Sequence, residues 1–232
     1  MDSLTDIIQT FAVYALPVLF AITAHEAAHG FVAQKLGDNT AAMLGRVTLN
    51  PVKHIDPIGT VLVPLALVLL TKGTFLFGYA KPVPVRLDRL KNPRRDMILV
   101  ALAGPLCNLV QALIWFVLFY LLLGIGVHEP FFLSMCIGKD PSHWIGGGVG
   151  INVVLFVFNL FPLLPLDGGR VLAGLLPPRA AMAFSRIEPY GFFIVMALVI
   201  SGVLVPIWMA PLMNLTLTVI NTLLLPLRAL LF

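Results

Sequence analysis

Apolar runs of helix length alternate with short polar segments along the whole chain. A transmembrane helix needs about 20 predominantly apolar residues. The runs predict five membrane-spanning helices, over about Ile7–Gln34, Met97–Leu123, Ile145–Phe161, Tyr190–Val205 and Ile207–Leu225. A sixth run, Ile58–Leu70, has only 13 residues. We therefore expect it to dip into the membrane and return as a re-entrant half-helix.

The distribution of basic residues favours this topology. If the N-terminus lies outside and Ile58–Leu70 is re-entrant, 14 of the 15 Lys and Arg residues fall on the cytoplasmic side and only Lys139 falls outside. This asymmetry follows the positive-inside rule. If Ile58–Leu70 crossed the membrane, Lys72–Arg95 would lie opposite Lys35–Lys53 and the asymmetry would be lost.

The composition also indicates a membrane protein. Hydrophobic residues make up 59% of the 232 residues and charged residues 11%, whereas soluble domains carry about 25% charged residues. We expect an all-α polytopic membrane protein with short extended segments near its active site. It should form one domain over residues 1–232, with a motif-bearing core at about 7–176 and two C-terminal helices at about 190–227.

Charge and cysteine usage exclude other classes. The net charge of +4 does not indicate a nucleic-acid partner, because the basic residues border the apolar runs. Two cysteines, Cys107 and Cys136, are too few for a disulfide framework or a cysteine zinc site. The first residues carry no basic region, so we do not expect a cleaved signal peptide.

The first predicted span contains the pattern His25-Glu26-Ala27-Ala28-His29. Residues four apart lie on one face of a helix, so His25 and His29 can bind one zinc ion. Glu26 is offset by one residue and can act as a general base on water, as in metalloproteases. Ionisable residues inside a membrane are costly and functional by default. A packed His and Glu cluster without metal is the alternative.

Asp167 is the candidate for a third metal ligand. It follows Pro162 and Pro165, which disfavour a regular helix, and precedes Gly168 and Gly169, which permit a close backbone approach. In the predicted topology the first and third spans both run inward, so Asp167 and the two histidines lie in the same half of the bilayer. A helix-capping role for Asp167 at a cytoplasmic loop is the alternative.

Together these motifs resemble the site-2 protease family of intramembrane zinc metalloproteases, in its compact bacterial form without a PDZ or nucleotide-sensing domain. The resemblance rests on HEAAHG (25–30), GYAKPVPV (78–85), GPLCN (104–108) and NLFPLLPLDGGR (159–170). It implies hydrolysis of transmembrane protein substrates, one Zn²⁺ per chain held by His25, His29 and Asp167, and residence in the bacterial cytoplasmic membrane with the active site toward the cytoplasmic half.

Three further polar residues are weaker site candidates. The resemblance implies that Asn159 binds substrate or supports the transition state, although a hydrogen bond between helices would explain it equally well. Asn108 is expected to be a polar contact between helices near the zinc. His54 lies just before the re-entrant stretch, and a proton-shuttle or polar-contact role stays open beside a simple loop role. The segment from Tyr79 to Val85 reads as extended because of its prolines, and could pair with an unwound substrate.

Two other functions compete with proteolysis. A divalent-metal transporter would use the His and Asp cluster as a transit site, but no paired repeat of broken helices is visible in the sequence. A relative that binds membrane proteins without cutting them would not need Glu26. The sequence does not reveal the substrate or the oligomeric state.

Overall fold

The protein is almost entirely helical. The computed structural model describes residues 4–62, 81–138 and 147–231, and no β-strand occurs among them. The longer α-helices are α1 (Leu4–Lys35), α4 (Pro93–Gly124), α6 (Gly147–Asn159), α9 (Glu188–Ile200) and α10 (Ala210–Leu223). Shorter α-helices are α2 (Thr40–Met43), α5 (Pro130–Ile137), α7 (Asp167–Leu175), α8 (Pro178–Ser185) and α11 (Leu225–Leu231). Short 3-10 or π-helices are η1 (Pro51–Lys53), η2 (Pro57–Leu62), η3 (Leu87–Arg89) and η4 (Val205–Met209).

The predicted class, an all-α polytopic membrane protein, is confirmed. Two described helices are long and apolar enough to cross a membrane, Val13–Lys35 in α1 and Pro93–Gly124 in α4. The number rises to four if the bent pairs α8 with α9 and η4–α10 with α11 each count as one span. The third predicted span corresponds to α6, which has 13 residues in the described part of the chain.

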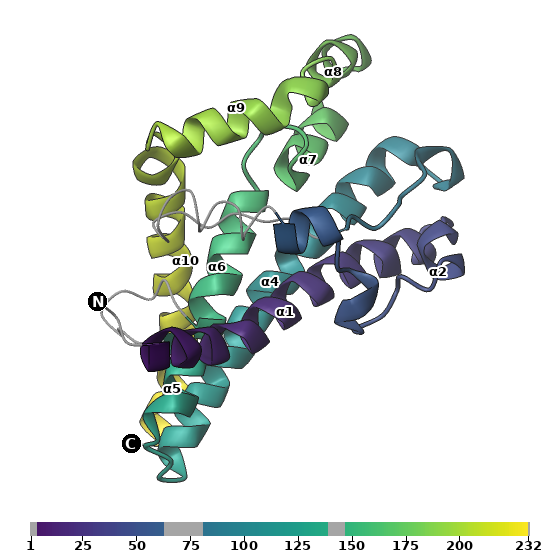
Figure 1. Ribbon diagram of the computed structural model, residues 1–232. Helices are drawn as coiled ribbons and strands as arrows, with labels where there is room; N and C mark the ends of the chain where they lie inside the picture. The colour runs from purple at the N-terminus through teal and green to yellow at the C-terminus, as the bar shows by residue number, and fades with distance from the viewer. Residues whose placement is uncertain (1–3, 63–80, 139–146, 232) are drawn as a thin grey trace.

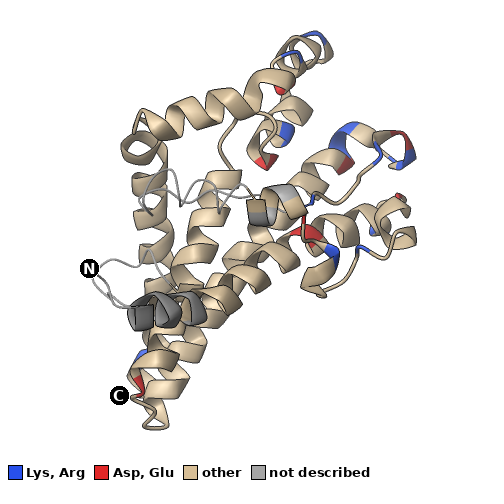
Figure 2. Ribbon diagram, in the orientation of Figure 1, with Lys and Arg blue, Asp and Glu red and all other residues tan. Residues whose placement is uncertain are grey.

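Charge is segregated along this bundle. Figure 2 shows most Lys, Arg, Asp and Glu residues at the end that contains the C-terminus of α1, the N-terminus of α4, and α7 and α8, while the middle of the bundle is nearly uncharged. A membrane core excludes charged side chains. Charge is therefore gathered at one end of the bundle and sparse in its middle.

The end of α1 in this charged region is fixed by a glycine turn. Gly37 has a φ of 116°, a value that favours glycine because it has no Cβ. The N–H of Asp38 donates to the carbonyl of Ala33 at 2.9 Å, and the N–H of Gly37 donates to Gln34 at 3.2 Å. This pair of bonds is a Schellman motif, which satisfies the last carbonyls of a helix. It ends α1 two turns after the His/Glu/His pattern.

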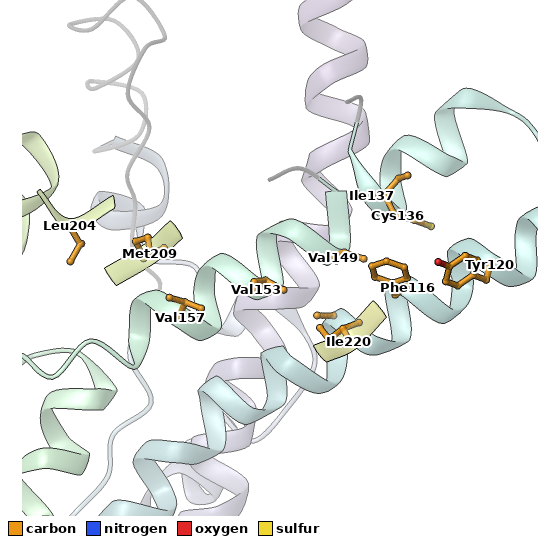
Figure 3. Packing of buried hydrophobic residues seen from close by; sticks show 11 residues of the cluster. Phe116, Tyr120, Cys136, Ile137, Val149, Val153, Val157, Leu204, Met209 and Ile220 are labelled. Carbon is orange, nitrogen blue, oxygen red and sulfur yellow. The ribbon is translucent and has the colours of Figure 1, made fainter. Parts of the chain in front are cut away.

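The main hydrophobic cluster lies where α6 packs against α4, α5 and the C-terminal helices. Val149, Val153 and Val157, spaced four residues apart, form one row along α6 (Figure 3). The first turn of α6 is glycine-rich, and a Cβ on Gly148 would lie 2.1 Å from the ring of Trp115. Small residues let helices in a membrane approach closely. This close approach fixes α6 against α4.

The C-terminal part differs from the prediction in one respect. Gly191 of α9 contacts Leu164, and Trp208 of η4 contacts Val157, so both ends of α9 lie at the same end of α6. In Figure 1 α9 runs across the top of α6 and α10 rather than alongside them. The predicted fourth span, Tyr190–Val205, therefore does not run antiparallel to the fifth, because hydropathy alone does not set a helix direction.

The position of Arg228 changes with this arrangement. α11 packs against the C-terminal end of α4, where Gly124 lies beside Leu231, and Tyr120 donates to Asn221 at 3.4 Å. Arg228 therefore lies at the far end of α4 from Arg94. The prediction that placed Arg228 on the same side as the other cytoplasmic basic residues does not fit the structure.

The re-entrant prediction for Ile58–Leu70 falls mostly outside the described residues. The two flanks of that interval are nevertheless described. The N–H of Lys81 donates to the carbonyl of His54 at 2.9 Å, so the two flanks lie side by side. The re-entrant course of the residues between them stays a prediction.

Candidate metal centre

The two histidines of α1 lie one helical turn apart and face α4. Their Nε2 atoms are 3.1 Å apart, and their ring centroids are 4.7 Å apart. Both residues are buried, with exposed fractions of 8% for His25 and 9% for His29. The sequence spacing therefore produces the expected pair of imidazoles on one face.

Asp167 completes a cluster of three donor atoms. Its Oδ2 lies 3.2 Å from Nε2 of His25 and 3.4 Å from Nε2 of His29. A tetrahedral zinc site with bonds of about 2.0–2.1 Å has donors about 3.3–3.4 Å apart, so these separations match. Within the described part of the chain, Oδ2 of Asp167 is also buried without a hydrogen-bond partner, as expected of an atom that binds a metal ion. The three residues fit a zinc ion.

The other ring nitrogens are fixed by α4. Nδ1 of His25 lies 2.6 Å from Oδ1 of Asn108, and Nδ1 of His29 lies 2.7 Å from the carbonyl of Val100. Both partners accept hydrogen bonds, so each Nδ1 carries the proton and each Nε2 presents a lone pair. Metal-binding histidines are oriented by such contacts. Asn108 thus lies beside the cluster, as the sequence led us to expect.

Asn152 extends this contact one step further. The Nδ2 group of Asn108 donates to Oδ1 of Asn152 at 2.9 Å, and Asn152 donates to the carbonyl of Gly148 at 2.8 Å. Both asparagines are fully buried. Asn152 fixes which way the Asn108 amide points, and so keeps its oxygen toward His25. Asn152 is not among the residues predicted from the sequence, although a polar residue inside an apolar run is a functional signal.

Gly104 makes room for the cluster. A Cβ at this position of α4 would lie 2.4 Å from Nε2 of His29 and 2.6 Å from Nε2 of His25. Any larger side chain would occupy the space in front of both donor nitrogens. This contact gives the GPLCN segment a physical role that the sequence alone did not reveal, because the partners are far apart in the chain.

Glu26 lies beside the cluster and is held by the extended segment 81–86. The backbone N–H of Val83 donates to Oε2 of Glu26 at 2.8 Å. Val83 is buried and packs close to Gly30. Glu26 is not one of the three clustered donors. The hydrogen bond from Val83 is to Oε2 of this carboxylate.

The remaining candidates are not brought into the donor cluster. Asn159 donates through Nδ2 to the carbonyl of Leu155 in its own helix at 3.0 Å, and no hydrogen bond from it to another helix is seen in residues 4–62, 81–138 and 147–231. His54 is buried, its Nε2 lies 3.0 Å from the carbonyl of Thr48, and its Nδ1 has no hydrogen-bond partner among the described residues. The roles predicted for both residues stay predictions.

Fold and site together define the class: a helical membrane protein with a His, Glu, His and Asp constellation of the metallopeptidase type. The sequence profile described as Peptidase family M50 matches residues 13–142, more than half of the chain. The chain belongs to this family, and the resemblance found in the sequence is confirmed.

Individual relatives agree with this assignment. "Putative zinc metalloprotease YwhC" of Bacillus subtilis is 40% identical over 186 residues, which cover 80% of this chain and 79% of that protein. "Putative zinc metalloprotease Rip2" of Mycolicibacterium smegmatis is 32% identical over 191 residues, which cover 80% of this chain and 66% of that protein. No solved structure matches the chain significantly.

Proposed function

We propose that this protein is an intramembrane zinc metalloprotease that cuts peptide bonds in or near transmembrane segments of other membrane proteins. The observation that carries the proposal is the spacing of the donor atoms of His25, His29 and Asp167. Their separations are those expected between the ligands of a tetrahedral zinc ion. Glu26 stands next to this cluster in the sequence order typical of metalloproteases. We expect one zinc ion per chain.

Zinc at this site supplies a Lewis acid that lowers the pKa of water toward about 7 and polarises a carbonyl group. Proton transfer is assigned to a side chain of the protein. Glu26 takes a proton from the attacking water at Oε1 and delivers it to the leaving amine. The Val83 N–H fixes the carboxylate through Oε2, and we assign the proton transfer to the other oxygen, Oε1. General acid–base catalysis of this kind is worth about 10²–10⁴ in rate.

The depth of the site supports proteolysis within the membrane. His25 lies ten residues before Lys35, the last residue of α1, which is about 15 Å along a helix. The hydrocarbon core of a bilayer is about 30 Å thick. The donor cluster therefore falls within the apolar layer, and the partners that fit it are transmembrane protein substrates.

The charge distribution supports an orientation. The basic residues gathered at the C-terminal end of α1 and the N-terminal end of α4 (Figure 2) suit a cytoplasmic surface under the positive-inside rule. We propose residence in a bacterial cytoplasmic membrane with the N-terminus outside. Because α10 runs in the opposite direction to α6, the C-terminus then lies outside as well.

The test compares Glu26→Gln with His25→Ala. Purified wild-type protein and both variants are assayed for zinc content and for cleavage of a transmembrane test segment in detergent. We expect Glu26→Gln to retain zinc and lose cleavage, because Gln can still accept the Val83 N–H but cannot take a proton. His25→Ala should lose both. Cleavage by Glu26→Gln at the wild-type rate, or zinc binding without any cleavage by the wild type, would contradict the proposal. The second result would favour a metal transporter or a non-proteolytic binder.

A further inference from the structure

The segment 160–166 connects α6 to α7 and determines where Asp167 lies. Asp167 is the first residue of α7, so any displacement of this segment moves the carboxylate. The donor separations at the cluster are 3.2 and 3.4 Å. Zinc sites tolerate deviations of about 0.2 Å from their bond lengths. The segment must therefore be held tightly if Asp167 is to bind zinc.

The first turn of α7 packs directly on this segment. A Cβ on Gly168 would lie 2.2 Å from the carbonyl oxygen of Leu160, and a Cβ on Gly169 would lie 2.3 Å from the backbone nitrogen of Leu164. Both contacts are to backbone atoms, which cannot rotate away as a side chain can. The segment and the first turn of α7 thus move as one unit.

The segment also packs against α9. A Cβ on Gly191 would lie 1.8 Å from the carbonyl oxygen of Leu164 and 2.9 Å from Cδ of Pro165. Leu164 is 3% exposed. Only glycine permits this approach, so α9 contacts the same segment on which α7 packs.

Trp208 of η4 holds the end of α6 from which the segment starts. In a continuous helix the carbonyl of Val157 would accept the N–H of Phe161, but that N–H bonds to Phe158 instead. The indole N–H of Trp208 donates to the Val157 carbonyl at 2.9 Å. The Trp208 ring also meets the Phe161 ring edge-on, at 5.3 Å between centroids. Trp208 thereby donates a hydrogen bond to the Val157 carbonyl, which lacks its helical partner, and packs on Phe161 in the segment 160–166.

We propose that α9 and η4 position the metal ligand Asp167, with Trp208 as a positioning residue and Gly191 as the contact point. The inference rests on the proposed function in that it takes Asp167 as a zinc ligand. It assigns a role to the C-terminal helices, which lie beyond the part of the chain that the family profile matches. Zinc affinity should accordingly depend on residues that do not touch the metal.

The test is a double-mutant cycle between Trp208→Phe and Asp167→Ala, with zinc affinity measured by chelator competition. Phe keeps a ring beside Phe161 and removes only the N–H donor. Loss of a contact that supports a metal ligand typically weakens metal affinity about 10–100-fold. We expect about a 10-fold loss for Trp208→Phe alone and no further loss when Asp167→Ala is already present, because no carboxylate is left to position.

Two matched controls accompany the cycle. Trp115→Phe makes the same chemical change beside Gly148, at the other end of α6 from Trp208. It should leave zinc affinity within about twofold of wild type, well below the roughly 10-fold loss typical of a contact that supports a metal ligand. Gly191→Ala should weaken zinc binding. Gly124→Ala should not, because the described atom nearest to its Cβ belongs to the Leu231 side chain, at 3.1 Å. Absorption spectra of Co²⁺-substituted protein should show a changed coordination geometry in Trp208→Phe and Gly191→Ala.

The outcomes separate the inference from the proposed function. Wild-type zinc affinity in Trp208→Phe and Gly191→Ala, with a weakened Asp167→Ala, would overturn the positioning role alone. A loss in Trp208→Phe of equal size with and without Asp167 would show that the tryptophan acts on general stability, which also overturns it. Wild-type affinity in Asp167→Ala would remove the ligand assignment and the inference together.

Discussion

Gly104→Ala adds one methyl group directly in front of the metal-binding nitrogens. Its Cβ would lie 2.4 Å from Nε2 of His29 and 2.6 Å from Nε2 of His25, whereas an ordinary contact is about 3.4 Å or longer. The rings or α4 must therefore shift by about 1 Å, several times the tolerance of about 0.2 Å for a zinc bond. We expect zinc affinity to fall by more than roughly 100-fold, beyond the effect typical of a supporting contact.

The same substitution should have a much smaller effect on folding. Overpacking a well-packed site costs about 1–3 kcal/mol, and alanine gains up to about 1 kcal/mol over glycine inside a helix. The two effects partly cancel. Gly104→Ala should therefore fold and melt near the wild-type temperature when both proteins are free of metal.

The assay combines zinc content after purification, chelator competition and thermal melting of the metal-free proteins in detergent. Gly124→Ala is the control, because it adds the same methyl group on the same helix, and the described atoms nearest to its Cβ belong to the Leu231 side chain. It should bind zinc as the wild type does. If Gly104→Ala kept wild-type zinc affinity, the metal could not lie between the two Nε2 atoms and Asp167.

Three further predictions concern other parts of the molecule. Asn152→Leu should lower zinc affinity about 10-fold in chelator competition, because it frees the Asn108 amide that orients His25; unchanged affinity would exclude this role. Asp38→Asn should lower the free energy of unfolding by about 1–3 kcal/mol at pH 7, because Asp38 accepts the N–H groups of Thr40 and Arg86. Burial opposes ionisation, but these hydrogen bonds keep the pKa of Asp38 below its usual value. The stabilisation of the fold by the Asp38 carboxylate is therefore complete above about pH 4 and is lost as the pH falls through the lowered pKa. If Asp38→Asn stayed less stable than the wild type in acid, this would be contradicted. Single cysteines are introduced at Asn50 and Lys91 in a chain without Cys107 and Cys136. Both should react with an impermeant reagent from the same side of the membrane, because His54 and Lys81 are hydrogen-bonded to each other. Labelling from opposite sides would refute the topology.

The features that the sequence could predict are local or carry a strong composition signal. α1 and α4 are long apolar helices, so their positions follow from hydropathy. The pairing of His25 and His29 follows from helix periodicity alone. The prolines and glycines around Asp167 indicate it as a ligand, because irregular backbone at membrane depth is tolerated only inside protein or beside a water-filled cavity.

The features that were missed depend on contacts between distant segments. Asn152 reaches His25 only through Asn108 on another helix, and Gly104 matters only because α1 brings two histidines against it. The direction of α9 depends on the approach of Gly191 to Leu164, which no periodicity contains. Apolar length predicts that a segment lies in the membrane, but packing decides whether it runs along the bundle or across its end.

The central claim is that this protein hydrolyses peptide bonds inside the apolar layer. The most direct measurement reconstitutes the zinc-loaded protein in liposomes with a single-span substrate and determines the product masses by mass spectrometry. We expect new termini within the apolar segment of the substrate, formed by the wild-type protein and absent with Glu26→Gln. Cleavage confined to residues outside the membrane, or the same products from Glu26→Gln, would contradict the account.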